Sequence, residues 1–182
     1  MARVLIILAQ GCEELEAVTV IDLLRRANID VITAGLDNQA VKASRGTVLI
    51  PDAELNDVAE GNYDMIVLPG GLPGADNLNE SSVVHELLKK MQSKKLWISA
   101  ICAAPKVLAR AGLLENKKYT CYPGSVNAEE AKGHATENVV VVDENIVTSR
   151  GPGTAMDFAL TLIELLLGKE AKNNVEKPLV RP

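Results

Sequence analysis

Residues 96–113 read LWISAICAAPKVLARAGL, and this stretch decides the fold. Leu96–Ile101 is a largely apolar run with the length of a buried strand, and Ala103–Leu113 has the apolar spacing of a helix. Only Cys102 separates the two, so the chain must turn sharply there. A strand that passes directly into a helix indicates a layered α/β fold around a mostly parallel sheet.

The rest of the chain continues this alternation of strands and helices. We predict further strands at Arg3–Ala9, Asp30–Leu36, Tyr63–Leu68, Val139–Val142 and Ile146–Ser149. We predict helices at Leu15–Asn28, Ser82–Met91 and Thr154–Leu167, and a terminal turn or helix at Glu170–Glu176. A short hairpin, Val41–Ser44 with Val48–Ile50, is expected around Arg45 and Gly46, and residues 69–74 (PGGLPG) are expected to form a turn.

Composition indicates a single globular domain over residues 1–182 that binds a small molecule. Of the 182 residues 47% are hydrophobic, enough for a full core. The 24 acidic and 19 basic residues give a net charge of −5, the wrong sign for nucleic acid or anionic lipid. Aromatic residues, 3% of the chain, offer little for bases to stack on. We therefore expect neither a sequence-specific nucleic-acid partner nor a membrane partner.

The N-terminus and the cysteines point to the cytoplasm. The apolar run Val4–Ala9 is too short for a signal peptide or a bilayer span. Cys12, Cys102 and Cys121 are odd in number and lack C-x-x-C spacing, so we interpret them as reduced thiols rather than as a disulfide framework or a zinc site. No metal and no cofactor is expected.

Cys102 is the first candidate for catalysis. It follows a predicted strand, at the edge of the sheet where ligands of open α/β folds collect. A sharp strand-to-helix turn exposes a nucleophile there, and a helix with Pro105 in its first turn directs free N–H groups and its positive dipole end toward the sulfur. Both effects favour the thiolate. The alternative is that Cys102 is a small buried hydrophobic residue.

Glu16 is the second candidate. Helical spacing places it on the apolar stripe of Val20 and Leu23, and burial of a carboxyl group raises its pKa. Such a group can donate a hydrogen bond or shuttle a proton. The alternative is that Glu13, Glu14 and Glu16 together favour the helix dipole at an N-terminus. We retain that interpretation for Glu13 and Glu14.

Two glycine-rich segments follow predicted strands. Gly70 and Gly71 allow backbone N–H groups to approach a ligand oxygen and could form an oxyanion hole, although most Pro-Gly-Gly segments are simply turns. Residues 151–153 (GPG) are interpreted as a tight turn, with Thr154 as N-cap and Asp157 completing a capping box.

The two histidines and the two other thiols are secondary candidates. His85 falls on the solvated side of its helix, and His134 lies in a polar loop. A Cys–His hydrolase needs a histidine base, so peptidase or amidase activity is disfavoured. Cys12 follows the first strand and is expected to be accessible, and Cys121 precedes the Tyr122–Pro123 pair.

Four motifs together resemble the ThiJ/PfpI superfamily, and within it the branch of the Parkinsonism-associated deglycase. They are GCEELEAV at 11–18, VLPGGLPGA at 67–75, SAICAAP at 99–105 and TSRGPGT at 148–154. The resemblance implies a flavodoxin-like three-layer α/β sandwich, a homodimer, and a helical segment at residues 170–182. It assigns Cys102 as nucleophile, Glu16 as its protonated partner, and oxyanion N–H groups to Gly70, Gly71 and Ala103.

The same resemblance adds three neighbours of the site. It places Arg26 and Arg45 near the dimer interface and the entrance of the site, where composition alone would predict solvated charges. This chain differs from many members of the branch at one position, because it has Tyr122 where they carry a histidine near the cysteine. A phenol with a pKa of about 10 is a poor base near neutral pH. Acid–base chemistry would then depend on Glu16.

The leading hypothesis is a cofactor-independent glyoxalase or deglycase that acts on methylglyoxal-type α-oxoaldehydes or on glycated proteins. Cys102 would add to the aldehyde, and Glu16 would move a proton between carbons. The alternative is an oxidative-stress sensor or chaperone in which Cys102 forms a sulfinate that accepts a hydrogen bond from Glu16. Peptidase or amidase activity is third.

Overall fold

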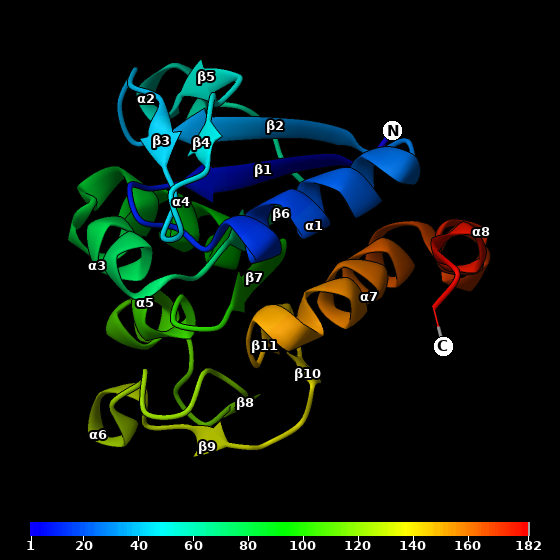
Figure 1. Cartoon of the computed structure of the whole chain (residues 1–182). Helices are drawn as coiled ribbons and strands as arrows, with labels where there is room; N and C mark the ends of the chain where they lie inside the picture. Colours follow the sequence, from blue (N-terminus) through cyan, green and yellow to red (C-terminus); the bar gives the residue numbers. More distant parts are fainter. Residues whose placement is uncertain (182) are drawn as a thin grey trace.

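The computed structural model describes residues 1–181, which form one seven-stranded sheet between two layers of helices (Figure 1). In spatial order the strands are β10 (Val140–Asp143), β11 (Ile146–Ser149), β7 (Trp97–Ile101), β6 (Met65–Leu68), β1 (Arg3–Leu8), β2 (Asp30–Gly35) and β5 (Ala53–Glu54). All neighbours run parallel except β10, which is antiparallel to β11. The predicted flavodoxin-like arrangement is confirmed.

The helices cover both faces of this sheet (Figure 1). They are α1 (Glu14–Arg26), α2 (Leu55–Val58), α3 (Leu72–Glu80), α4 (Ser82–Ser93), α5 (Pro105–Arg110), α6 (Ala128–Ala131), α7 (Ala155–Leu167) and α8 (Lys169–Glu176). In β1, Val4, Ile6 and Leu8 face the core beneath α1 and α7, and the residues between them face the core beneath α4 and α5. Because both faces of β1 are covered, its sequence is continuously apolar.

Two small sheets lie outside the central one. β3 (Val41–Lys42) and β4 (Val48–Leu49) form the predicted antiparallel hairpin, whose turn carries Arg45. β8 (Lys118–Tyr119) pairs in parallel with β9 (His134–Ala135), so His134 lies in a short strand rather than in a loop. These two-residue pairings are too short to leave a periodic pattern in the sequence.

The largest difference from the sequence prediction is α3, whose first turn occupies part of the segment expected to be a simple turn. Pro73 is tolerated there because the first turn of a helix has no internal partner for its N–H groups. Gly74 packs against Cys12 so closely that an added Cβ would lie 2.7 Å from the Cys12 backbone. Pro73 and Gly74 therefore lie in a packed helix, although proline and glycine usually indicate a turn.

Two helix starts also differ from expectation. α5 begins at Pro105 and ends at Arg110, a shorter span than Ala103–Leu113. The capping box at the start of α7 is absent, because the hydroxyl of Thr154 bonds back to Gly151 and to Ser149 instead. Asp157 accepts a hydrogen bond from Arg181 at 2.7 Å.

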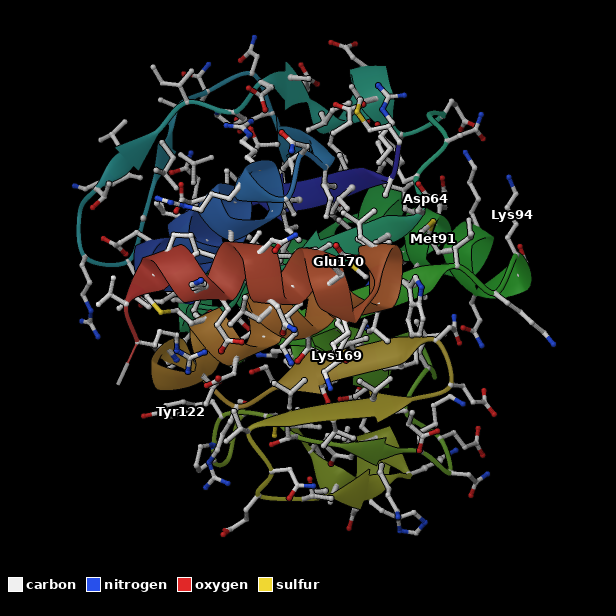
Figure 2. All side chains as sticks on the ribbon, turned by 90° about the vertical axis from the view of Figure 1, so that its right-hand side faces the viewer. Asp64, Met91, Lys94, Tyr122, Lys169 and Glu170 are labelled. Atoms are coloured by element: carbon white, nitrogen blue, oxygen red, sulfur yellow. The ribbon has the colours of Figure 1, made fainter. Side chains whose placement is uncertain are left out.

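The C-terminal segment packs on α7. α8 buries Val175, and a 3₁₀ turn follows at Lys177–Leu179. Figure 2 shows α8, with Lys169 and Glu170 at its start, lying across the front of α7. Helical structure covers residues 169–179, residues 180 and 181 are not helical, and residue 182 of the predicted segment 170–182 lies outside the described residues. No helix within residues 1–181 is long and apolar enough to cross a bilayer.

Candidate active site

Cys102 occupies a strained elbow at the carboxyl end of β7. Its φ of +63° lies in the left-handed region, which residues with a side chain seldom adopt. Two backbone hydrogen bonds hold it there, from the Cys102 N–H to Ser149 O at 3.0 Å and from the Tyr122 N–H to Cys102 O at 2.8 Å. Its side chain is 8% exposed. Backbone strain of this kind persists where the surrounding structure fixes it, and it clusters at functional sites.

Glu16 reaches the same place from α1. Its side chain is fully buried beside the apolar stripe of Val20 and Leu23, and its Oε2 accepts a hydrogen bond from the Gly70 N–H at 2.8 Å. The thiol of Cys102 lies within hydrogen-bonding reach of the carboxyl. Burial raises the pKa of Glu16 to about 7, although the contacts from Gly70 and Cys102 act in the opposite direction.

Gly70 must be glycine because the two functional side chains meet against it. An added Cβ would lie 2.6 Å from the Cβ of Cys102 and 2.7 Å from Oε2 of Glu16. Its N–H already binds Glu16, so the expectation that Gly70 donates to a substrate oxyanion is corrected. The backbone N–H groups of Gly71 and Ala103 instead approach the sulfur of Cys102. These two donors are placed to bind an oxyanion formed next to that sulfur.

The thiol of Cys102 is more basic than the sequence suggested. Burial raises its pKa to about 12, and the charge of Glu16 and its hydrogen bond add to this effect. The N–H groups of Gly71 and Ala103 oppose the shift without cancelling it. The N–H group of Ala103 thus favours the thiolate, in the direction expected for a helix start, but burial and Glu16 outweigh it in the resting site.

A cavity of about 420 Å³ opens onto Cys102, whereas the fully buried Glu16 is not part of its lining. It is lined by Glu13, Ser44, Arg45, Gly71, Leu72, Pro73, Cys102, Ala103, Tyr122 and Pro152. Figure 2 shows Tyr122 toward one end of the molecule, with Asp64, Met91 and Lys94 toward the opposite end. The cavity thus lies at the carboxyl end of the parallel strands, where the order of elements predicted a site.

The two predicted arginine neighbours have different positions. Arg45 lines the cavity from the hairpin turn. Arg26 is at the last turn of α1, roughly 18 Å along the helix axis from Glu14, and pairs with Asp22 at 2.7 Å. It is not among the residues that line the cavity of this chain.

Glu14 has a part in the site that sequence reasoning missed. Each of its carboxylate oxygens accepts the Arg45 N–H at 3.0 Å, and it also binds the Thr47 N–H and the Ser44 hydroxyl. Desolvation opposes its ionisation, but these hydrogen bonds and one from its own N–H lower the pKa of Glu14 to about 2. Glu13 and Glu14 share the single hydroxyl proton of Ser44, whose oxygen lies 2.7 Å from Glu13 Oε2 and 3.1 Å from Glu14 Oε2. The two acids attach the hairpin turn to the start of α1, and no local signal in the sequence announces this long-range contact.

The remaining thiols and histidines lie outside the cavity lining. Cys12 is fully buried and not accessible as expected, and burial raises the pKa of its thiol to about 11. Cys121 is half-buried, and burial raises its pKa as well. A ring nitrogen of His85 lies 2.9 Å from Asn79 O, and His134 is exposed.

Known proteins resemble this chain over nearly its whole length. The profile of the DJ-1/PfpI family matches residues 2–165. The Parkinson disease protein 7 homolog of Danio rerio is 44% identical over 182 residues, which cover 98% of this chain and 96% of that protein. A Caenorhabditis elegans protein named glutathione-independent glyoxalase DJR-1.2 is 36% identical over 170 residues, 93% of this chain and 91% of that protein.

A solved structure repeats the fold. The crystal structure of Drosophila melanogaster DJ-1beta superposes with a TM-score of 0.93 at 44% identity, covering 100% of this chain and 98% of that one. The similarity therefore includes every element that positions the site.

Proposed function

The chain belongs to the DJ-1/PfpI family, and from this premise we propose that it is a glutathione-independent glyoxalase or deglycase. Its substrates would be α-oxoaldehydes such as methylglyoxal, or their early adducts on proteins. The observation that carries this proposal is the pairing of a buried carboxyl group, whose pKa is raised to about 7, with a thiol on a strained elbow. A pKa near the working pH suits a group that must both take and return a proton.

The proposed reaction begins when ionised Glu16 takes the thiol proton as the sulfur of Cys102 adds to the aldehyde carbon. Glu16 returns this proton to the new alkoxide, which gives a hemithioacetal. Glu16 then removes the hydrogen of the former aldehyde carbon as a proton, and the hydroxyl proton of that carbon moves to the keto oxygen. The resulting enediolate takes the proton held by Glu16 at the former keto carbon, which leaves a 2-hydroxy thioester. The N–H groups of Gly71 and Ala103 would hold the developing negative oxygen. Water hydrolyses the resulting thioester, releasing lactate and the free thiol.

Formation of lactate from methylglyoxal without glutathione tests this proposal. We expect wild-type protein to form lactate and Cys102→Ser to form none above background. Cys121→Ser is the matched control, because this thiol is half-buried outside the cavity lining, and it should retain the activity. Lactate formation by Cys102→Ser at the wild-type rate would overturn the assignment of the nucleophile.

A redox-sensing or chaperone function is the second candidate, and one observation favours it. Within residues 1–181, Oε1 of Glu16 is buried without a hydrogen-bond partner, so a protonated carboxyl could donate to a sulfinate on Cys102. Two equivalents of peroxide would oxidise the thiol to sulfinate and be reduced to water. Mass spectrometry after mild peroxide should then find two oxygens on Cys102 before any on Cys12 or Cys121. Earlier oxidation of either other thiol would count against a sensor.

We also propose, from the family resemblance, that the single domain acts in the cytoplasm as a homodimer. Leu15 and Val18 support the dimer, because they leave 51% and 46% of their surface exposed on α1 although both are large apolar residues. Light scattering should give twice the chain mass of 19.5 kDa. Peptidase activity is the least supported function, since neither histidine lines the cavity.

A further inference from the structure

We propose that the cavity prefers α-oxoaldehydes whose keto carbon carries a bulky apolar or aromatic group, and that Tyr122 determines this preference. The inference rests on the proposed function and narrows its substrate class. In the corresponding reaction an arylglyoxal takes up water and becomes a 2-hydroxy-2-aryl acid. The aldehyde carbon is oxidised to the acid and the keto carbon is reduced to the alcohol, so no external oxidant or reductant is needed.

The size of the cavity is the first support. Its volume of about 420 Å³ falls in the range of roughly 300–1,000 Å³ that is usual for sites of larger ligands. Methylglyoxal, whose only apolar part is a methyl group, would fill a small fraction of it. The remaining space must hold either water or a larger substituent.

The chemistry of the wall is the second support. Leu72, Pro73, Tyr122 and Pro152 give one part of the lining an apolar character, and Leu72 and Tyr122 keep 61% and 49% of their surface exposed. About half or more of each of these two large groups is therefore open to solvent. Removing apolar surface from contact with water is favourable. A substrate whose apolar substituent displaces water from these side chains would therefore bind more tightly than one without such a substituent.

The attachment of Tyr122 to the elbow is the third support. Its N–H donates to the carbonyl of Cys102 at 2.8 Å, and its own carbonyl accepts bonds from the N–H of Ser125 at 3.0 Å and its hydroxyl at 2.8 Å. Its ring lies beside Gly151, where an added Cβ would be 3.4 Å from the ring. The backbone of Tyr122 is therefore fixed relative to Cys102 and Gly151 limits the ring on one side, which lowers the entropy cost of ordering the ring when a ligand binds.

The experiment compares kcat/KM for phenylglyoxal and for methylglyoxal. We expect wild type to favour phenylglyoxal, and Tyr122→Ala to lower the phenylglyoxal-to-methylglyoxal ratio about three- to ten-fold, mainly through KM for phenylglyoxal, because a pair of aromatic rings is lost. Tyr122→Phe is the matched variant. It keeps the ring and loses the hydroxyl, so it should keep the wild-type ratio. An unchanged ratio in Tyr122→Ala would overturn the assignment.

A binding measurement separates this inference from the proposed function. Calorimetry on the Cys102→Ser variant compares mandelate with lactate, which are the acids that the two reactions would form. Tighter binding of mandelate, weakened when Tyr122→Ala is added, supports the apolar wall even if no turnover is found. Equal binding of the two acids would reject the wall even if methylglyoxal is a substrate.

Discussion

Glu14 and Glu16 lie two residues apart at the start of α1, yet their carboxyl groups have opposite properties. Glu14 points to the hairpin turn, where backbone N–H groups and a hydroxyl surround it, and its pKa is lowered to about 2. Glu16 points into the core, where a single backbone N–H from Gly70 meets it, and its pKa is raised to about 7.

This difference shows which physical effect determines the pKa of an acidic side chain at the start of a helix. Both residues are in the first turn of α1 and experience the same helix dipole. The dipole therefore cannot account for pKa values on opposite sides of the ordinary one. The number of hydrogen bonds to the charged form, set against the loss of solvent, decides the outcome. One helix end thus supplies both a charged carboxylate that binds the hairpin turn and a buried carboxyl group with a raised pKa beside the Cys102 thiol.

The largest effect is expected from Glu16→Gln. The amide keeps the shape of the side chain but cannot carry a proton between carbons, so turnover of methylglyoxal should fall about 10²- to 10⁴-fold. Initial rates of lactate formation measure this, and urea unfolding at pH 7 should show that the variant is folded. Turnover at the wild-type rate would mean that another group moves the proton.

The pH dependence of stability should separate the two acids. The folded state holds the proton of Glu16 more tightly than the unfolded chain, so this group stabilises the protein most below pH 4.5. Its contribution is lost as the pH rises from 4.5 to about 7, by roughly 3 kcal/mol for a fully buried group.

Urea unfolding of wild type and Glu16→Gln from pH 4.5 to 8 measures this loss. The difference between the two unfolding free energies should change across that window and become constant above it. A difference that does not vary with pH would show that Glu16 ionises normally.

Gly70→Ala should disturb the close packing of Cys102 and Glu16 against Gly70, a contact that Glu14 lacks. The added methyl group would overlap Cys102 and Glu16, so we expect a loss of about 1–3 kcal/mol in unfolding free energy, together with reduced turnover. Gly153→Ala is the matched control, because a Cβ there has no neighbour within 4 Å. Equal stability of the two variants would mean that the contact at Gly70 relaxes at no cost.

The features of the fold that could be predicted from the sequence are those whose physical cause lies in neighbouring residues. The buried strand β1 and the sharp turn at Cys102 follow from continuous apolar runs, and the inward direction of Glu16 follows from helical spacing. Helix α3 is not predicted because proline and glycine usually signal a turn, whereas here Pro73 fits the first helical turn and Gly74 packs on Cys12.

The same limit applies to the site. The bond from Gly70 to Glu16 joins residues 54 positions apart, and the raised pKa of Cys102 depends on burial together with this neighbouring carboxyl. A pattern along the chain identifies such residues as candidates. Only the packed structure determines which N–H group binds which oxygen, and so which acid stays ionised.

The smallest effect is expected from Glu14→Gln, which tests the other half of the comparison. The neutral amide has one acceptor oxygen in place of two, so it would hold the N–H groups of Arg45 and Thr47 less firmly and loosen a turn that lines the cavity. We expect KM for methylglyoxal to rise about two- to five-fold while kcat stays within about two-fold, since the turn contributes to binding rather than to proton transfer.

The stability of Glu14→Gln should also depend on pH in the sense opposite to that of Glu16→Gln. A lowered pKa stabilises the folded state above pH 4.5, and this contribution is lost as the pH falls toward 2. Wild type should therefore exceed the variant in urea midpoint at pH 6, and the gap should narrow at pH 3. If the difference in urea midpoint instead widened at low pH, the ionised carboxylate of Glu14 would not be what stabilises the hairpin turn. The turn would then depend on Glu13 and its bond to Ser44.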